Sequence, residues 1–245
     1  NVCDNSESFQ VIIKNNTGNP LSGISLNLDF PPGISYQIGS IVEATNLNII
    51  ESNVTNLNNI QLTSFNIPIN DSLQFTIGIT ADINAVILQQ NGNIFRNNVI
   101  LNYSGGIENH LSASYNILFP SLNILNVTPS SISVISGDTL IRAITITNAG
   151  FGRTNQIVIS DIINQPGLSL ISTSLGTLNN TTDSIIISTT NFSNQGNFDN
   201  YLDYGESFTL LETLYIQGCL AQTVTSSLKA HWGCNGLLQS SPTTY

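Results

Sequence analysis

The sequence predicts an all-β protein built from two β-sandwich domains in tandem. Short runs rich in Ile, Val and Thr alternate with segments rich in Asn, Gly and Ser, and these residue types favour strands and turns respectively. The 245 residues are enough for two sandwiches of roughly 100 residues each. Finally, the two halves contain the same landmarks in the same order, which is typical of a duplicated domain.

The predicted strands are short runs with continuous or alternating apolar character. In the first half they cover residues 9–13, 24–30, 60–65, 73–79 and 99–103. In the second half they cover residues 132–135, 140–146, 157–162, 185–187, 208–216 and 224–232. No segment between them has the period and length of a helix, so no helix is predicted.

The shared landmarks are turns and strand starts that recur at similar spacing. They pair Asn16-Thr17-Gly18 with Asn148-Ala149-Gly150, Pro32-Gly33 with Pro166-Gly167, Asp71-Ser72-Leu73 with Glu206-Ser207-Phe208, and Asn102-Tyr103 with His231-Trp232. Because glycine tolerates a positive φ, Gly18 and Gly150 are predicted to adopt one in the turn that leaves a strand. Pro120 interrupts strand pairing, so the predicted boundary separates residues 1–121 from residues 122–245.

Composition narrows the range of partners. Lys and Arg number 5 against 15 for Asp and Glu, a net charge of −10, and this surface repels the phosphates of nucleic acids and anionic membranes. No run reaches the roughly 20 apolar residues of a membrane span. Neither nucleic acid binding nor membrane insertion is therefore expected. Because the sequence starts at Asn1 without Met or an apolar leader, we interpret it as a processed fragment.

The sharpest local motif is a candidate calcium loop before the strand at Phe208. Oxygen-bearing residues stand at loop positions 1, 3, 5, 7, 9 and 12 of the EF-hand pattern, namely Gln195, Asn197, Asp199, Tyr201, Asp203 and Glu206. Calcium prefers six to eight oxygen ligands, and Tyr201 would supply its backbone carbonyl. Two residues depart from the pattern, since Gln195 replaces Asp and Asn200 replaces Gly. The alternative interpretation is a solvated turn without metal. Any calcium here would be structural.

Three cysteines, Cys3, Cys219 and Cys234, permit at most one bridge. An extracellular setting would allow Cys219 and Cys234 to form a disulfide. A tight hairpin between them would place the two Cα atoms farther apart than the roughly 6 Å that a disulfide spans. A Cys219–Cys234 disulfide and two buried thiols therefore both stay open.

Aromatic and ionisable residues suggest two further kinds of site. Trp232 and Tyr103 could stack on sugars, but packing in a sandwich core is the favoured interpretation. The only histidines, His110 and His231, lie near no recognisable nucleophile motif, and no catalytic residue is predicted. A glycoside hydrolase using carboxylates among Asp199, Asp203 and Glu206 is a rival hypothesis.

Several motifs together resemble a known family. The Gly137-Asp138-Thr139 segment, the Asn148-Ala149-Gly150 turn and the Leu202–Ser207 segment are similar to the bacterial surface repeat catalogued as domain of unknown function eleven. The Trp232–Asn235 segment resembles the versions of that repeat in Bacteroidota adhesins. The resemblance implies an immunoglobulin-like Greek-key β-sandwich in a long, type nine-secreted adhesin involved in attachment or gliding motility.

The resemblance also implies a location and partners. It places the chain outside the cell, attached to the outer membrane, with neighbouring repeats of the same long chain as partners. Surface glycans or other cell-surface proteins are further expected partners. The predicted function is thus that of a non-catalytic stalk or adhesive segment. The alternative is a carbohydrate-binding accessory module of an extracellular polysaccharide-processing protein.

Overall fold

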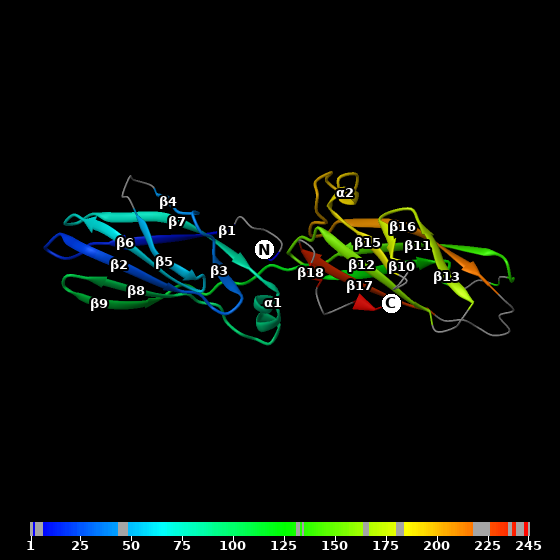
Figure 1. Ribbon diagram of the computed structural model, residues 1–245, viewed down its shortest axis with the longest axis horizontal. Coiled ribbons are helices and arrows are strands. Elements are labelled where there is room, and N and C mark those ends of the chain that lie inside the picture. Colours follow the sequence, from blue (N-terminus) through cyan, green and yellow to red (C-terminus); the bar gives the residue numbers. More distant parts are fainter. Residues whose placement is uncertain are drawn as a thin grey trace. The chain divides into compact units, whose positions relative to one another are not determined.

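The computed structural model describes residues 2, 7–43, 49–130, 133, 135–163, 167–179, 184–217, 226–234, 237–238 and 243–244. The chain divides into two compact units, Asn1–Ile117 and Leu118–Tyr245. Each unit is an immunoglobulin-like β-sandwich of two antiparallel sheets (Figure 1), so the predicted fold class is confirmed. No helix in the described part is long and apolar enough to cross a membrane.

The described residues of the first unit form nine strands and one helix. They are β1 (Glu7–Lys14), β2 (Leu21–Asp29), β3 (Ile34–Tyr36), β4 (Val42–Glu43), β5 (Ile50–Asn56), β6 (Asn59–Ile67), β7 (Ser72–Ala81), α1 (Ile83–Gln90), β8 (Asn98–Tyr103) and β9 (Gly106–Leu111). One sheet has the order β1-β7-β3, with β4 also paired to β7, and the other has the order β5-β6-β2-β8-β9. Alternate residues of β2 and β7 face inward, so Ile24, Leu26, Phe75 and Ile77 are buried between the sheets.

The second unit repeats this arrangement and adds a strand at its start. Its elements are β10 (Leu122–Thr128), β11 (Thr139–Asn148), β12 (Gln156–Ile163), β13 (Leu168–Thr173), β14 (Thr177–Asn179), β15 (Ser184–Ile187), α2 (Thr189–Phe192), β16 (Ser207–Ile216), β17 (Ser226–Cys234), β18 (Leu237–Leu238) and β19 (Thr243–Thr244). One sheet has the order β10-β11-β16-β13, and the other has the order β14-β15-β12-β17-β18, with β19 also paired to β17. Ile144, Ile159 and Leu210 are among the buried core residues.

Two buried asparagines occupy the same place in the two units. Asn15 follows β1 and donates its backbone N–H to Asp71 O at 2.9 Å, and Asn148 ends β11 and donates its N–H to Glu206 O at 3.0 Å. Each side chain also donates Nδ2–H to the carbonyl of the residue four positions later, at 2.9 Å in the first unit and 2.7 Å in the second. The duplication is therefore visible as a repeated hydrogen-bond pattern.

This pattern corrects the sequence alignment by one residue. Asn15, and not Asn16, is the counterpart of Asn148, because Asn15 is 1% exposed and Asn148 is fully buried. The predicted role of the glycines is also wrong. Neither Gly18 nor Gly150 has a positive φ, whereas Gly33 and Gly167 of the two Pro-Gly turns have φ values of 84° and 99°.

Gly150 is required for a different reason. A Cβ atom at this position would lie 2.4 Å from Ser121 N and 2.5 Å from Phe119 O. The backbone of residues 119–121 thus runs directly against the turn, and Gly152 N donates to Phe119 O at 3.0 Å. These contacts place residues 119–121 with the second unit. The division falls at Ile117/Leu118, whereas the sequence predicted it between residues 121 and 122.

Two other expectations differ from the structure. The sequence predicts no helix, yet α1 begins after Asp82, whose side chain accepts hydrogen bonds from Asn84 N and Ala85 N, as an N-cap residue does. The strand predicted at residues 132–135 is not formed at Ser133 or Ile135, the two described residues of that range. The strand that pairs with β11 lies upstream, at β10.

Candidate functional site

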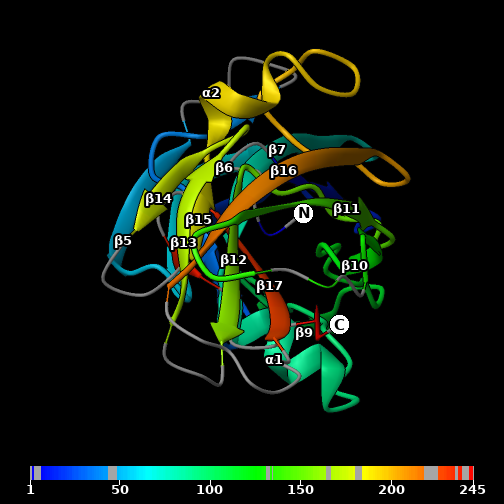
Figure 2. The same cartoon turned by 90° about the vertical axis from the view of Figure 1, so that its right-hand side faces the viewer.

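Asn148 brings two loops of the second unit together. Its Nδ2 donates to Gly152 O at 2.7 Å and to Leu202 O at 3.0 Å, and its Oδ1 accepts from Gly150 N at 3.0 Å. Its backbone carbonyl accepts from Gly205 N at 2.7 Å. We call residues 149–153 and 195–206 the aromatic loop end. Figure 2 shows the second of these loops, in gold, projecting beyond α2.

Exposed aromatic rings lie on both loops. Phe151 and Tyr204 stack with ring centroids 4.7 Å apart and an interplanar angle of 26°, although the two residues are 72% and 57% exposed. Phe198 is 75% exposed, and the guanidinium of Arg153 lies 4.1 Å from the centroid of the Tyr201 ring. Exposed ring faces of this kind can stack on apolar or cationic groups of a ligand.

Glu206 organises the longer loop. Its Oε1 accepts from Asn197 N and its Oε2 accepts from Asp203 N, both at 2.8 Å. Gly196, with a φ of 54°, lies so close to this carboxylate that a Cβ there would be 2.5 Å from Oε1. The Glu206 carboxylate thus joins the backbone at Asn197 to the backbone at Asp203 and holds the loop closed.

Asn197, Asp199 and Asp203 form the polar face of the loop. Asn197 Nδ2 donates to Asp203 Oδ2 at 2.9 Å and to Asp199 Oδ2 at 3.4 Å. Asp199 Oδ1 accepts from Tyr201 N at 2.7 Å. Burial raises the pKa of Asp203, and the charges of Asp199 and Glu206 raise it further, against the lowering effect of the Asn197 hydrogen bond. The loop therefore concentrates negative charge beside the aromatic rings.

The geometry of the calcium motif differs from an EF-hand loop in two respects. Positive φ values occur at Gly196 and Phe198 and not at Asn200, where an EF-hand loop makes its sharp turn. Within the described ranges, no group of three or more His, Cys, Asp or Glu side chains is arranged to hold a metal. Gln195 contributes turn hydrogen bonds through its backbone, donating to Phe192 O at 2.8 Å and accepting from Phe198 N at 2.9 Å. Calcium at this loop stays a prediction, and it would have to compete with the backbone for Glu206.

The other predicted site residues lie apart from this loop. Trp232, on β17, is 5% exposed and belongs to the core, as the favoured interpretation predicted. For Tyr103 the favoured interpretation is wrong, because this residue, at the end of β8, is half-buried and does not belong to the core. Cys3, Cys219 and the side chain of Cys234 lie outside the described residues, so the disulfide stays a prediction.

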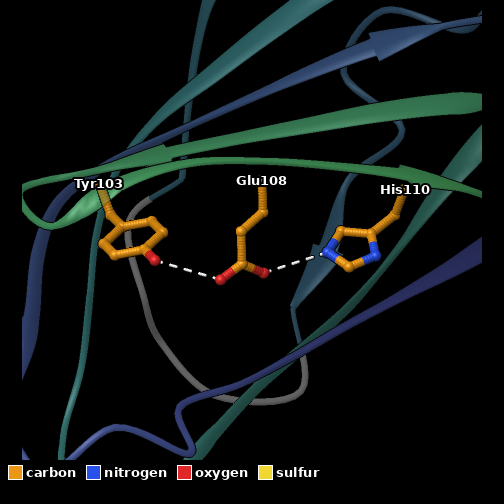
Figure 3. Close-up of polar contacts among 3 residues, drawn as sticks. All are labelled: Tyr103, Glu108 and His110. Atoms are coloured by element: carbon orange, nitrogen blue, oxygen red, sulfur yellow. Dashed lines mark hydrogen bonds and ion pairs between the residues drawn. The ribbon is translucent and has the colours of Figure 1, made fainter.

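Tyr103, Glu108 and His110 form an exposed polar row along the β8–β9 hairpin (Figure 3). Tyr103 Oη donates to Glu108 Oε1, and His110 Nε2 lies against Glu108 Oε2, each at 3.1 Å. The hydrogen bond to Glu108 raises the pKa of Tyr103, and the hydrogen bond from His110 lowers the pKa of Glu108. A raised pKa keeps the phenol protonated, which is the reverse of nucleophile activation.

Sequence reasoning missed Phe151, Phe198 and Tyr204. The available signal was their context, since each ring is flanked by Gly, Asn or Asp in the segments Gly150-Phe151-Gly152, Asn197-Phe198-Asp199 and Asp203-Tyr204-Gly205. A large ring in a turn sequence lacks the alternating neighbours that would bury it in a strand. Such rings are candidates for a surface contact.

Comparison with known proteins gives low similarity. No family model and no curated protein matches the sequence. Among solved structures, the class 5 fimbriae chaperone CfaA is 12% identical, with 98% of this chain and 92% of that chain covered and a TM-score of 0.25. The collagen adhesin CNA from S. aureus is 10% identical, with 97% and 85% covered and a TM-score of 0.27. The type II cohesin dyad of ScaA from Acetivibrio cellulolyticus is 9% identical, with 94% and 85% covered and a TM-score of 0.28. At such TM-scores these likenesses carry no argument about function.

Proposed function

We propose that the chain is a non-catalytic segment of a secreted cell-surface protein, in which β-sandwich units in series hold binding loops away from the cell. The observation that supports this most directly is the duplication. Asn15 and Asn148 make the same contacts at the same register in two units, so what the two halves share is a structural framework. A framework repeated in series lengthens a chain.

A stalk must resist extension, which single-molecule force spectroscopy on the 245-residue chain measures directly. We expect two unfolding events, one for each unit, with each event releasing about 3.5 Å of contour length per residue. Asn148→Ala should lower the force of one event and leave the other unchanged. A single event, or extension without a force peak, would argue against two load-bearing units.

A second candidate function is glycan binding at the aromatic loop end. The stacked and exposed pair Phe151–Tyr204 favours it, together with the amide of Asn197 and the carboxylate of Asp199 on the same loop end. Rings that stack on sugars and polar groups that hydrogen-bond hydroxyls are the usual elements of such a surface. This function would make the segment an adhesive module as well as a spacer.

A glycan array with matched variants tests this candidate. Retention of the wild type by a defined polysaccharide should be lost in the Phe151→Ala/Tyr204→Ala variant. The Tyr103→Ala variant, which lacks an aromatic ring of the first unit, should still be retained by the same polysaccharide. Equal loss in both variants, or no retention of the wild type on any glycan, would reject the aromatic loop end as a glycan site.

A further inference from the structure

In the first unit, β1 is the outer strand of its sheet. It pairs with β7 over all eight residues without a register shift, and within the described ranges no strand pairs with its other side. Since Asn15 N–H points to the β7 side and successive residues of a strand direct their N–H groups to opposite sides, Gln10, Ile12 and Lys14 direct theirs to the outer edge. These groups form a regular row of hydrogen-bonding positions.

The second unit has a strand at the equivalent edge. There β10 pairs antiparallel with β11, from Leu122↔Asn148 to Thr128↔Ala143. Because Asn148 is the counterpart of Asn15, β10 covers positions that match residues 10–15 of the first unit. Leu122, Ile124 and Val127 of β10 are buried, whereas the residues between them are exposed. The second unit therefore indicates both the register and the chemistry of a strand that fits this edge.

The side chains of Gln10, Ile12 and Lys14, the residues whose N–H groups point to the outer edge, are exposed. In the second unit, β10 contacts β17 and β19 as well as β11. Ile12 is 51% exposed. Its counterpart on β11, Thr145, lies beside β10 and is less exposed, being half-buried.

We propose that the outer edge of β1 accepts an extended strand of the β10 kind, donated by a further unit of the same build. The strand would run antiparallel to β1, place apolar side chains inward in the pattern of Leu122, Ile124 and Val127 with the β10 register shift between Ile124 and Asn126, and bond to the N–H groups of Gln10, Ile12 and Lys14. Addition of a strand to an exposed sheet edge is a general mode of peptide recognition. This inference concerns strand pairing between units. It does not depend on the proposed cell-surface function, and it rests on the duplication of the two units.

A fluorescein-labelled peptide with the sequence Leu122–Thr128 serves as the probe for the full 245-residue chain. We expect its fluorescence anisotropy to rise saturably with protein concentration. Ile12→Pro should weaken binding by roughly tenfold or more, because proline removes an outward N–H without touching the ladder to β7. Ile12→Ala keeps that N–H and should bind within a few-fold of the wild type. A peptide with Asp in place of Leu122, Ile124 and Val127 should bind roughly tenfold more weakly or worse.

Hydrogen exchange of the wild-type chain provides a readout that does not depend on the folding of the proline variant. Added peptide should slow exchange at Gln10, Ile12 and Lys14. Absence of saturable binding would overturn the proposal. Equal binding by the wild type and by a folded Ile12→Pro variant would also overturn it, since the peptide would then be replacing β10 in the second unit.

Discussion

Arg142 and Glu212 face each other across the ladder between β11 and β16, with Arg142 Nε donating to Glu212 Oε1 at 2.6 Å. Arg142 is 9% exposed and Glu212 is fully buried. Because Asn15 corresponds to Asn148 and Asp71 to Glu206, Phe9 corresponds to Arg142 and Ile77 to Glu212. Phe9 and Ile77 are also directly paired, between β1 and β7. One unit thus has a buried ion pair where its copy has an apolar pair.

Replacing the ion pair by its apolar counterpart is the first test of the duplication. Removing one partner strands a buried charge and should cost about 3–5 kcal/mol of unfolding free energy, so Glu212→Ile and Arg142→Phe should each destabilise strongly. The double variant Arg142→Phe/Glu212→Ile should recover most of that loss, because it recreates the Phe9–Ile77 pair. Urea unfolding measures all three. Additive losses in the double variant would contradict the register equivalence.

Asn148→Ala should destabilise the second unit by about 3 kcal/mol, because it leaves buried carbonyls and N–H groups of both loops without their partner. Asn15→Ala should act in the same way on the first unit. Asn16→Ala is the matched control, since Asn16 is adjacent but exposed. Denaturant unfolding gives the free energies. If Asn16→Ala costs as much as Asn15→Ala, the equivalence of Asn15 and Asn148 is wrong.

The raised pKa of Asp203 makes a prediction about pH. A folded-state pKa above the ordinary value of 3.8 means that the folded chain holds this proton more tightly than the unfolded chain. Stability from this group is therefore lost as the pH rises from 3.8 through the folded pKa. Asp203→Asn should be at least as stable as the wild type at pH 7, with the difference narrowing as the pH falls below 4.

Chemical unfolding at pH 7 and below pH 4 checks this direction. Asp138→Asn removes one carboxylate elsewhere in the second unit and controls for net charge. If Asp203→Asn is less stable than the wild type at pH 7, favourable interactions of the Asp203 carboxylate outweigh the free-energy cost of burying its charge, and the prediction is wrong.

Calcium addition tests the predicted metal loop. If calcium binds, its stabilisation follows mass action and reaches about 2.7 kcal/mol at a concentration one hundred times the Kd. Asp199→Asn/Asp203→Asn keeps an acceptor oxygen at each position and removes two charges, so it should abolish that stabilisation. Thermal unfolding in calcium, in magnesium and in a chelator makes the comparison. An unchanged melting temperature in calcium would leave Glu206 with its structural role alone.

The pattern of apolar residues predicted the long central strands, because alternate positions of β1, β2, β7, β11 and β16 bury one face. It missed β10, whose place it gave to residues 132–135. It did not predict α1, whose start depends on the Asp82 cap. Nor did it separate Asn15 from Asn16, because the two are adjacent residues of the same type and only the folded structure buries one of them. The contact between Phe151 and Tyr204 was also hidden, because it exists only once Asn148 has joined two loops that lie far apart in the sequence.

Glycine substitutions provide the last comparison, between Gly150 and Gly18. Gly150→Ala would place its Cβ 2.4 Å from Ser121 N and 2.5 Å from Phe119 O, and backbone atoms cannot move away as a flexible side chain can. We expect a loss of about 1–3 kcal/mol. A Cβ at Gly18 meets nothing within 4 Å, and its φ suits alanine, so Gly18→Ala should be neutral or stabilising by about 0.5 kcal/mol. Denaturant unfolding separates the two. Equal losses would restore the interpretation that both glycines serve the same turn.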